Sequence, residues 1–303
     1  MPTSKKPRKQ SSTVRTVSDL SVFPDPRSLQ PSSAEYKSAA NDETLWQAQE
    51  LVYDSWETSD CRSRFALARQ ALKLSVFCAD AWLTLAERPS LSRSERRQLI
   101  ERAVAAEELA LGEGRLKENE GHFWGVLETR PYMRARGELG EVLWDTGEKE
   151  AAIQNYREML ILNPGDNQGI RYILAAKHLE MGKMDMLKSL MEQCADEYSP
   201  EIQYTRVLIA YFEECENAED IAGLAFETNR HVPGMLSGRV PTVPVGDYVT
   251  LGGKDQAQAM LMPMAQRGDK FPVPLNGWMK SLPQLGVQSR HLMDRIKSET
   301  IRF

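Results

Sequence analysis

Apolar residues in the central part of the chain recur with the period of a helix. From Asp42 onward Ala, Leu, Glu, Gln and Arg dominate, and no sustained alternation of β-branched residues occurs before about residue 230. These residue types favour helices, and apolar side chains spaced three and four positions apart share one helix face. The pattern therefore predicts an all-α core.

The predicted helices come in pairs that are joined by short turns. The clearest pair lies between Pro131 and Pro164, because proline suits a first helical turn and Asp145-Thr146-Gly147 supplies the connection. Ser92 and Glu95 have the spacing of a capping box for a helix that we expect to end near Gly112. Similar patterns predict helices within residues 65–86, 166–194 and 199–226. We therefore expect about four or five helix pairs before residue 233.

One of these pairs matches a known repeat in part. A Leu-Gly step, a large residue, Ala, an aromatic residue and Pro follow one another at Leu139-Gly140, Leu143, Ala152, Tyr156 and Pro164. This spacing resembles the tetratricopeptide repeat of about 34 residues, although Arg136 stands where Trp is usual and Leu143 where Tyr is usual. The resemblance implies an all-α helix-turn-helix solenoid, a superhelix whose concave surface holds extended peptides or partner helices.

Two segments point to a narrower family. Gly121–Arg136 and Leu162–Tyr172, together with His231-Val232-Pro233 and Gly252–Ala257, resemble the tetratricopeptide-like family that includes the suppressor-of-tumorigenicity-seven proteins and their soluble microbial relatives. The resemblance covers about residues 43–266, and it implies an interaction scaffold without catalytic residues. Eukaryotic members carry membrane-spanning segments. Here the longest uncharged apolar run, Val207–Phe212, is far shorter than the roughly 18 residues that a spanning helix needs, so we expect no membrane insertion.

Charge divides the chain into a basic beginning and an acidic remainder. The 303 residues have a formal net charge of −5, yet residues 1–18 hold five basic residues and no acid, so the remainder stands at −10. This polar stretch lacks apolar periodicity, and we expect a disordered basic tail over residues 1–40. The run Lys5-Lys6-Pro7-Arg8-Lys9 is a nuclear-import or polyanion-binding patch under one interpretation and a solubilising tail under another.

The chain is thus expected to have three parts. The tail is followed by tetratricopeptide-like helical repeats over residues 41–233, and residues 234–303 change character. Pro233, Pro241 and Pro244 favour an extended connection, after which a helix is predicted from Lys254 to about Met262. Because terminal repeats are usually atypical, this last part is an irregular cap and tail, or alternatively an arm that docks on another subunit.

Residues that bind metals or perform catalysis do not occur at the usual spacings. Four cysteines and four histidines are isolated from one another, so we expect reduced, buried, structural thiols, no metal and no cofactor. No G-x-S-x-G, H-E-x-x-H or Walker-type motif occurs, and we expect no enzyme. Adjacent acids such as Glu107-Glu108 are expected on solvated helix faces. Neither an apolar signal segment nor a disulfide framework is evident, which favours the cytoplasm, or the nucleus in a eukaryote.

The most suggestive local chemistry is a basic and aromatic cluster. Arg130 and Arg134 are four residues apart near a predicted helix start, so they would share a face. With residues of the following repeat they would form a pocket that holds a carboxylate or a phosphate. The candidate partner-binding residues are Arg130, Tyr132, Arg134, Arg136, Arg171 and Tyr172. Alternatively, these arginines form structural salt bridges with Glu128, Glu138 and Glu141.

A long connection over residues 112–129 contains His122-Phe123-Trp124. It is either a lid or contact loop, or a segment whose aromatic side chains pack between repeats.

Taken together, the sequence predicts a protein–protein interaction scaffold that binds a peptide or a partner protein on its concave face. The alternative is a nucleic-acid-associated regulator whose basic tail contacts phosphates.

Overall fold

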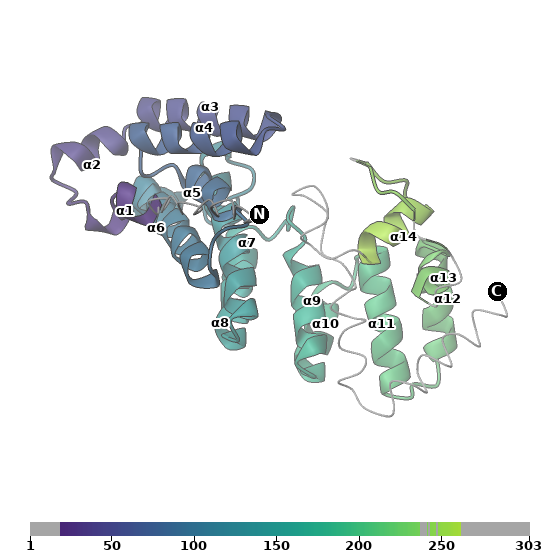
Figure 1. Cartoon of the computed structure of the whole chain (residues 1–303). Coiled ribbons are helices and arrows are strands. Elements are labelled where there is room, and N and C mark those ends of the chain that lie inside the picture. Colours follow the sequence, from purple (N-terminus) through teal and green to yellow (C-terminus); the bar gives the residue numbers. More distant parts are fainter. Residues whose placement is uncertain (1–18, 237–240, 242, 247, 262–303) are drawn as a thin grey trace, which may run out of the picture. The chain divides into compact units, whose positions relative to one another are not determined.

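A computed structural model of the chain describes residues 19–236, 241, 243–246 and 248–261. Within these residues the chain forms α-helices and two short 3-10 helices, and no strand occurs in them (Figure 1). The predicted all-α fold is confirmed. The basic run at residues 5–9 and the predicted tail beyond residue 261 lie outside the described residues, so their proposed roles remain predictions.

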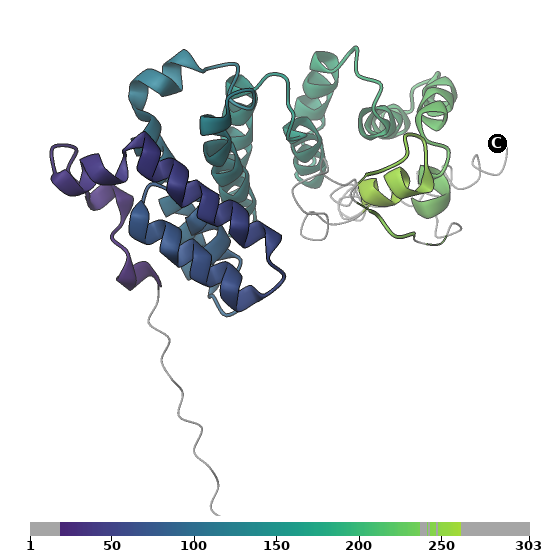
Figure 2. The ribbon, with the colours of Figure 1, turned by 90° about the horizontal axis from the view of Figure 1, so that it is seen from above.

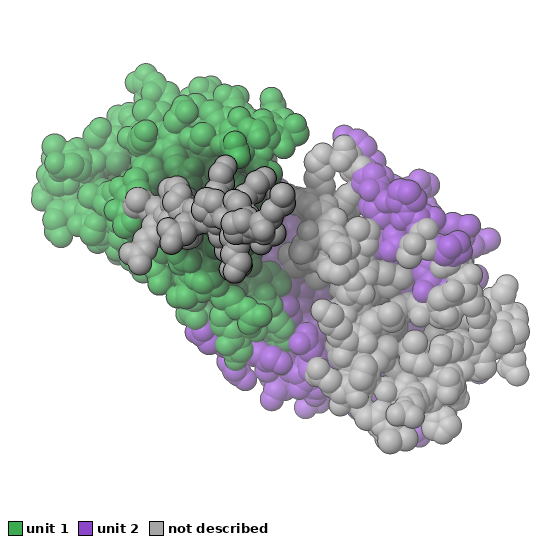
Figure 3. Space-filling model, viewed as in Figure 1, with its two compact units in different colours: residues 1–119, 125–147 green, residues 120–124, 148–303 purple. Residues whose placement is uncertain are grey.

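The helices belong to two compact units, which are coloured separately in Figure 3. Unit 1 comprises residues 1–119 and 125–147, and unit 2 comprises residues 120–124 and 148–303. The division at Gly147 separates the two helices that the sequence paired between Pro131 and Pro164. Each of these helices is therefore described with its own unit.

Unit 1 is built around a short buried helix, α5. Its helices are α1 (Asp19–Val22), η1 (Pro26–Ser28), α2 (Ala34–Ala39), α3 (Asp42–Glu57), α4 (Cys61–Leu74), α5 (Ala79–Ala86), α6 (Arg93–Glu118), η2 (Leu127–Thr129) and α7 (Arg130–Asp145). Helices α3 and α4 lie side by side in both ribbon views (Figures 1 and 2), and α5 packs against α3, α4, α6 and α7. Trp82 and Leu85 of α5 are fully buried, so this helix forms the centre of the unit 1 core.

The ends of several helices follow from local sequence. The predicted capping box is present, because the Ser92 Oγ accepts from the Glu95 N–H at 3.2 Å and the Ser92 N–H donates to the Glu95 carboxylate at 2.9 Å. Helix α7 begins at Arg130 with Pro131 in its first turn, as predicted. The predicted helix end near Gly112 is confirmed, since the backbone leaves the helical conformation there, with φ of +67°, before a second helical stretch of α6 runs to Glu118.

Residues 19–40, which the sequence predicted to be disordered, are folded onto unit 1. Phe23 is buried and meets the ring of Trp82 edge-on, with ring centroids 6.1 Å apart. Tyr36 meets Phe77 in the same manner at 4.9 Å. The prediction of disorder is therefore wrong for this segment. Its mean composition is polar, but two aromatic side chains anchor it on the core, and aromatic burial contributes strongly per residue.

Unit 2 has the helices that the sequence predicted, together with a short helix at residues 232–236, where the prediction of an extended connection is wrong. Pro233 fits there because proline is tolerated in a first helical turn. The helices of unit 2 are α8 (Lys149–Leu162), α9 (Ile170–Glu180), α10 (Met184–Gln193), α11 (Pro200–Phe212), α12 (Ala218–Thr228), α13 (Val232–Leu236) and α14 (Lys254–Leu261). Helix α9 packs against α8, α10 and α11, α11 packs against α12, and α13 packs against α14. The predicted capping helix is thus present as α14, and its last residue is Leu261.

Candidate ligand-binding cavity

Unit 1 contains a cavity of about 540 Å³ between α3, the second half of α6 and the segment that enters α7. Trp46 and Leu127 line it while 54% and 55% of their surfaces remain exposed, so they stand at its opening. Further apolar or aromatic walls come from Leu45, Tyr53, Ala110, Leu111, Val126 and Pro131. Predominantly apolar walls and this volume are typical of sites that bind small molecules or peptide side chains.

A glycine kink shapes one side of the cavity. Gly112 has a φ of +67°, a backbone conformation that L side chains rarely adopt, and it interrupts α6. Leu111 before the kink and Arg115 and Glu118 after it all line the cavity. The kink therefore places both parts of α6 along the same cavity wall.

A single acid, Glu107, lies in the buried part of this wall. Its residue is only 7% exposed, and the structure gives its carboxyl group no hydrogen-bond partner among the described residues. Burial raises the pKa of Glu107 well above its usual range, the charge of Asp80 raises it further, and the charge of Arg134 lowers it. Burial and Asp80 outweigh Arg134, so this carboxyl group keeps its proton to a higher pH than an exposed glutamate does.

Behind the cavity wall runs a chain of polar contacts. The Gln49 amide donates to the Asp80 carboxylate at 2.8 Å, and the Cys78 thiol donates to Gln49 Oε1 at 3.8 Å. Arg134 Nε donates to Asp80 Oδ1 at 2.8 Å, and a second guanidinium nitrogen bonds the other carboxylate oxygen. Both ends of Gln49 are thus engaged, which fixes its amide at the cavity surface. Burial also raises the pKa of the Cys78 thiol, so the thiol stays protonated.

The cavity is acidic overall. Its charged lining residues are Asp42, Glu107, Arg115, Glu118 and Glu128. The one base among them, Arg115, pairs with Asp42 at 3.0 Å. Helix α3 adds negative charge beside the cavity, because it holds five acidic residues and no basic residue. An acidic surface of this kind attracts cations and repels anions.

The candidate residues that the sequence placed on α7 make contacts inside unit 1. The hydroxyl of Tyr132 donates to Glu108 at 2.9 Å and accepts from Arg136 Nη1 at 2.8 Å. Arg136 is buried, with its guanidinium over the Tyr132 ring. Arg134 is held by Asp80, and Arg130 is half-buried at the start of the helix. The structure therefore brings Tyr132 and Arg136 together, and it sets Arg134 behind the cavity.

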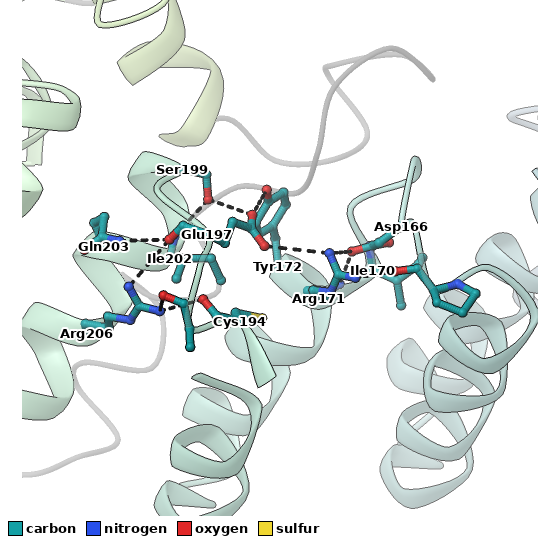
Figure 4. A network of polar contacts seen from close by, with 12 residues as sticks. Asp166, Ile170, Arg171, Tyr172, Cys194, Glu197, Ser199, Ile202, Gln203 and Arg206 are labelled. Atoms are coloured by element: carbon teal, nitrogen blue, oxygen red, sulfur yellow. Dashed lines mark hydrogen bonds and ion pairs between the residues drawn. The ribbon is translucent and has the colours of Figure 1, made fainter. Parts of the chain in front are cut away.

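The other two candidates, Arg171 and Tyr172, belong to a polar network within unit 2, shown in Figure 4. The Tyr172 hydroxyl donates to the carboxylate of Glu197, and Ser199 Oγ donates to the same carboxylate at 2.9 Å. The Arg171 guanidinium lies 3.7 Å from the other oxygen of Glu197. Asp166 accepts from the backbone N–H of Arg171 at 2.9 Å. The network ties the first turn of α9 to the connection that enters α11.

The prediction that Glu107 lies on a solvated helix face is wrong. Glu108 is exposed, but Glu107 is buried, because the two adjacent side chains point to different sides of α6. A signal was present, since Glu107 lies four residues after Ala103 and four before Leu111, and both of these are buried. An acid on the apolar stripe of a helix predicts a buried carboxyl group.

The structure also tests the predictions for Phe123 and for the four cysteines. Phe123 is fully buried in unit 2, and its N–H donates to the Leu162 carbonyl at 3.2 Å, which favours the packing interpretation of that connection. The four cysteines are free thiols, but Cys61 is exposed and Cys215 is half-buried, so the prediction that all four are buried is wrong for these two residues. Cys61 begins α4, where the first turn faces solvent.

Comparisons with protein-family models, with curated proteins and with solved structures found no match to this chain. Among the described helices, none combines the length and the apolar character needed to span a membrane. Within the same residues, no group of three His, Cys, Asp or Glu side chains is placed to hold a metal ion.

Proposed function

We propose that the chain is a protein–protein interaction module that binds a peptide segment of a partner protein in the cavity of unit 1. The observation that carries this proposal is the exposure of Trp46 and Leu127 at the opening of the cavity. Large apolar side chains that remain exposed around a concavity are typical of binding sites, since their desolvation contributes to affinity.

The arrangement of helices supports a repeat scaffold of the tetratricopeptide kind. Helices α3 and α4 pack as one pair and α5 and α6 as the next, while α9 with α10 and α11 with α12 form pairs in unit 2. In this scheme α3 is the first helix of its pair, and it contributes Trp46 to the cavity. A peptide bound there would lie on the surface that such repeats use for recognition.

The experiment selects ligands without assuming their sequence. The full-length chain is used to select binders from a phage-displayed random peptide library, and fluorescence anisotropy then measures the affinity of the selected peptides. We expect dissociation constants of about 1–100 μM. Trp46→Ala is expected to weaken binding by about tenfold or more, because aromatic residues at the opening of a site carry much of its energy.

Tyr198→Ala is the matched control, since Tyr198 is an exposed aromatic residue of unit 2 and is not among the cavity residues. It should leave the affinity unchanged. Circular dichroism verifies that both variants remain folded. The proposal is rejected if no peptide binds, or if Trp46→Ala binds the selected peptides as tightly as the unmodified chain does.

A further inference from the structure

We infer that the peptide bound by unit 1 is basic and that it inserts a lysine or arginine side chain into the cavity, where the cation pairs with the carboxylate of Glu107. This inference rests on the proposed peptide-binding function and names the chemistry of its ligand.

Glu107 is a buried carboxyl group in the cavity wall. A buried carboxyl group ordinarily finds a hydrogen-bond partner, because leaving it without one costs free energy. Glu107 is 93% buried in the wall of an accessible cavity, yet it has no hydrogen-bond partner among the described residues. A ligand group that donates hydrogen bonds, entering through the cavity, would satisfy it.

Two charged side chains of neighbouring helices face Glu107. Asp80 on α5 and Arg134 on α7 are the two whose charges act on it, with opposite signs. The guanidinium of Arg134 already bonds both oxygens of Asp80, so this pair is internally compensated. Glu107 therefore lacks a cation of its own. An ammonium or guanidinium group bound in the cavity would supply one, and it would favour the ionised carboxylate.

The cavity is lined by acidic and aromatic side chains. Acids outnumber bases among the lining residues, and Arg115 is paired with Asp42. Trp46 and Tyr53 present aromatic rings on the same side, from a helix without any basic residue. Aromatic faces and carboxylates together attract cationic side chains. This chemistry is opposite to that of the arginine cluster predicted from the sequence, which would hold a carboxylate or a phosphate.

The test compares two peptides on the full-length chain by fluorescence anisotropy. Both are fluorescein-labelled Ala-Leu-Xaa-Leu-Ala peptides, with lysine at the central position in one and uncharged norleucine in the other. We expect the lysine peptide to bind about tenfold or more tightly, because a charge-assisted hydrogen bond is among the stronger polar contacts. Glu107→Gln keeps the side-chain shape and is expected to remove most of this preference.

Glu113→Gln is the matched control, because it makes the same charge change on the same helix at an exposed position outside the cavity lining. It should retain the preference. If both peptides bind the unmodified chain equally, or if Glu107→Gln keeps the preference, the inference of a cation site is overturned while peptide binding stands. If neither peptide binds, the inference is overturned, and the library selection decides the proposed function separately.

A third arm identifies the source of the cation. Pentylamine carries the ammonium group and the alkyl chain of lysine without a peptide backbone. We expect it to displace the lysine peptide only at about hundredfold higher concentration, because the flanking leucines add contacts. Displacement at equal concentration would overturn the peptide as the occupant of the cavity.

Discussion

Asp80 and Arg134 form a bidentate ion pair in which the carboxylate is fully buried and the guanidinium is one-fifth exposed. The pair joins α5 to α7, and Gln49 on α3 donates a further hydrogen bond to the same carboxylate. Three helices of unit 1 therefore meet at one buried charge. The geometry of the cavity wall depends on this junction, since Gln49 is also a lining residue.

Removing the cation of this pair should destabilise unit 1. Arg134→Met leaves the Asp80 charge buried and undercompensated, so we expect the free energy of unfolding to fall by about 3 kcal/mol. The double variant with Asp80→Asn should recover part of this loss, since no buried charge remains. Urea denaturation followed by circular dichroism measures both.

The control for this prediction is Arg96→Met. Arg96 pairs with Glu138 at 2.7 Å, but both side chains are close to half exposed. Solvent-exposed pairs contribute little, so this change should cost less than about 1 kcal/mol. Equal losses for Arg96→Met and Arg134→Met would contradict the role given to the buried pair. A partner-binding test based on charge reversal at Arg134 would therefore measure unfolding as well as binding.

Lowering the pH should reduce the stability of unit 2, because His178 becomes protonated. Its side chain is buried in α9, and Nδ1 has no hydrogen-bond partner in the described part of the chain. Burial, followed by the charge of Arg157, lowers the pKa of His178 from 6.5 to about 4. A lowered pKa means that the unfolded state binds the proton more readily. The stability that depends on neutral His178 is present above pH 6.5 and is lost as the pH falls toward 4.

The comparison is with His178→Leu, which cannot be protonated. Between pH 7 and about pH 5 the unmodified chain should lose about 1–2 kcal/mol relative to this variant. Hydrogen exchange of the α9 amides across this range reports the loss locally. An unmodified chain and a variant that respond to acid in parallel would exclude His178 as the cause.

Tyr172→Phe tests the polar network of unit 2. The substitution removes the hydroxyl that donates to Glu197, and a net loss of about 1 kcal/mol in unfolding free energy is expected. Tyr198→Phe, which changes a hydroxyl on an exposed ring, should have little effect. We expect neither variant to change peptide affinity. Lost affinity with unchanged stability in Tyr172→Phe would instead favour the partner-binding role predicted from the sequence.

Local sequence was sufficient to predict most helices. Capping residues such as Ser92 and helix-start residues such as Pro131 act within one turn, so their effect is readable without the fold. The folded segment at residues 19–40 was missed because its order comes from contacts with residues far along the chain, such as that of Tyr36 with Phe77. Such contacts leave no periodic pattern in a short segment.

The sequence did not predict the cavity, for a related reason. It depends on the second helical stretch that follows the kink at Gly112, whereas the glycine predicted only that a helix ends there. The arginine cluster was chosen as a candidate site because of its composition. Glu107, the acid that lines the cavity, is a single polar residue on the apolar face of α6. Position on the helix face was the more informative signal, because it reports burial directly.

The central claim is that the unit 1 cavity pairs a ligand cation with Glu107. Carbon-13 NMR of the Glu107 side-chain carboxyl group, assigned by its absence in Glu107→Gln, follows its ionisation directly. The free chain should show a titration midpoint well above the usual 4.5, and saturating lysine peptide should lower that midpoint by about one unit or more while the norleucine peptide leaves it in place. A midpoint that the lysine peptide does not move would contradict the account.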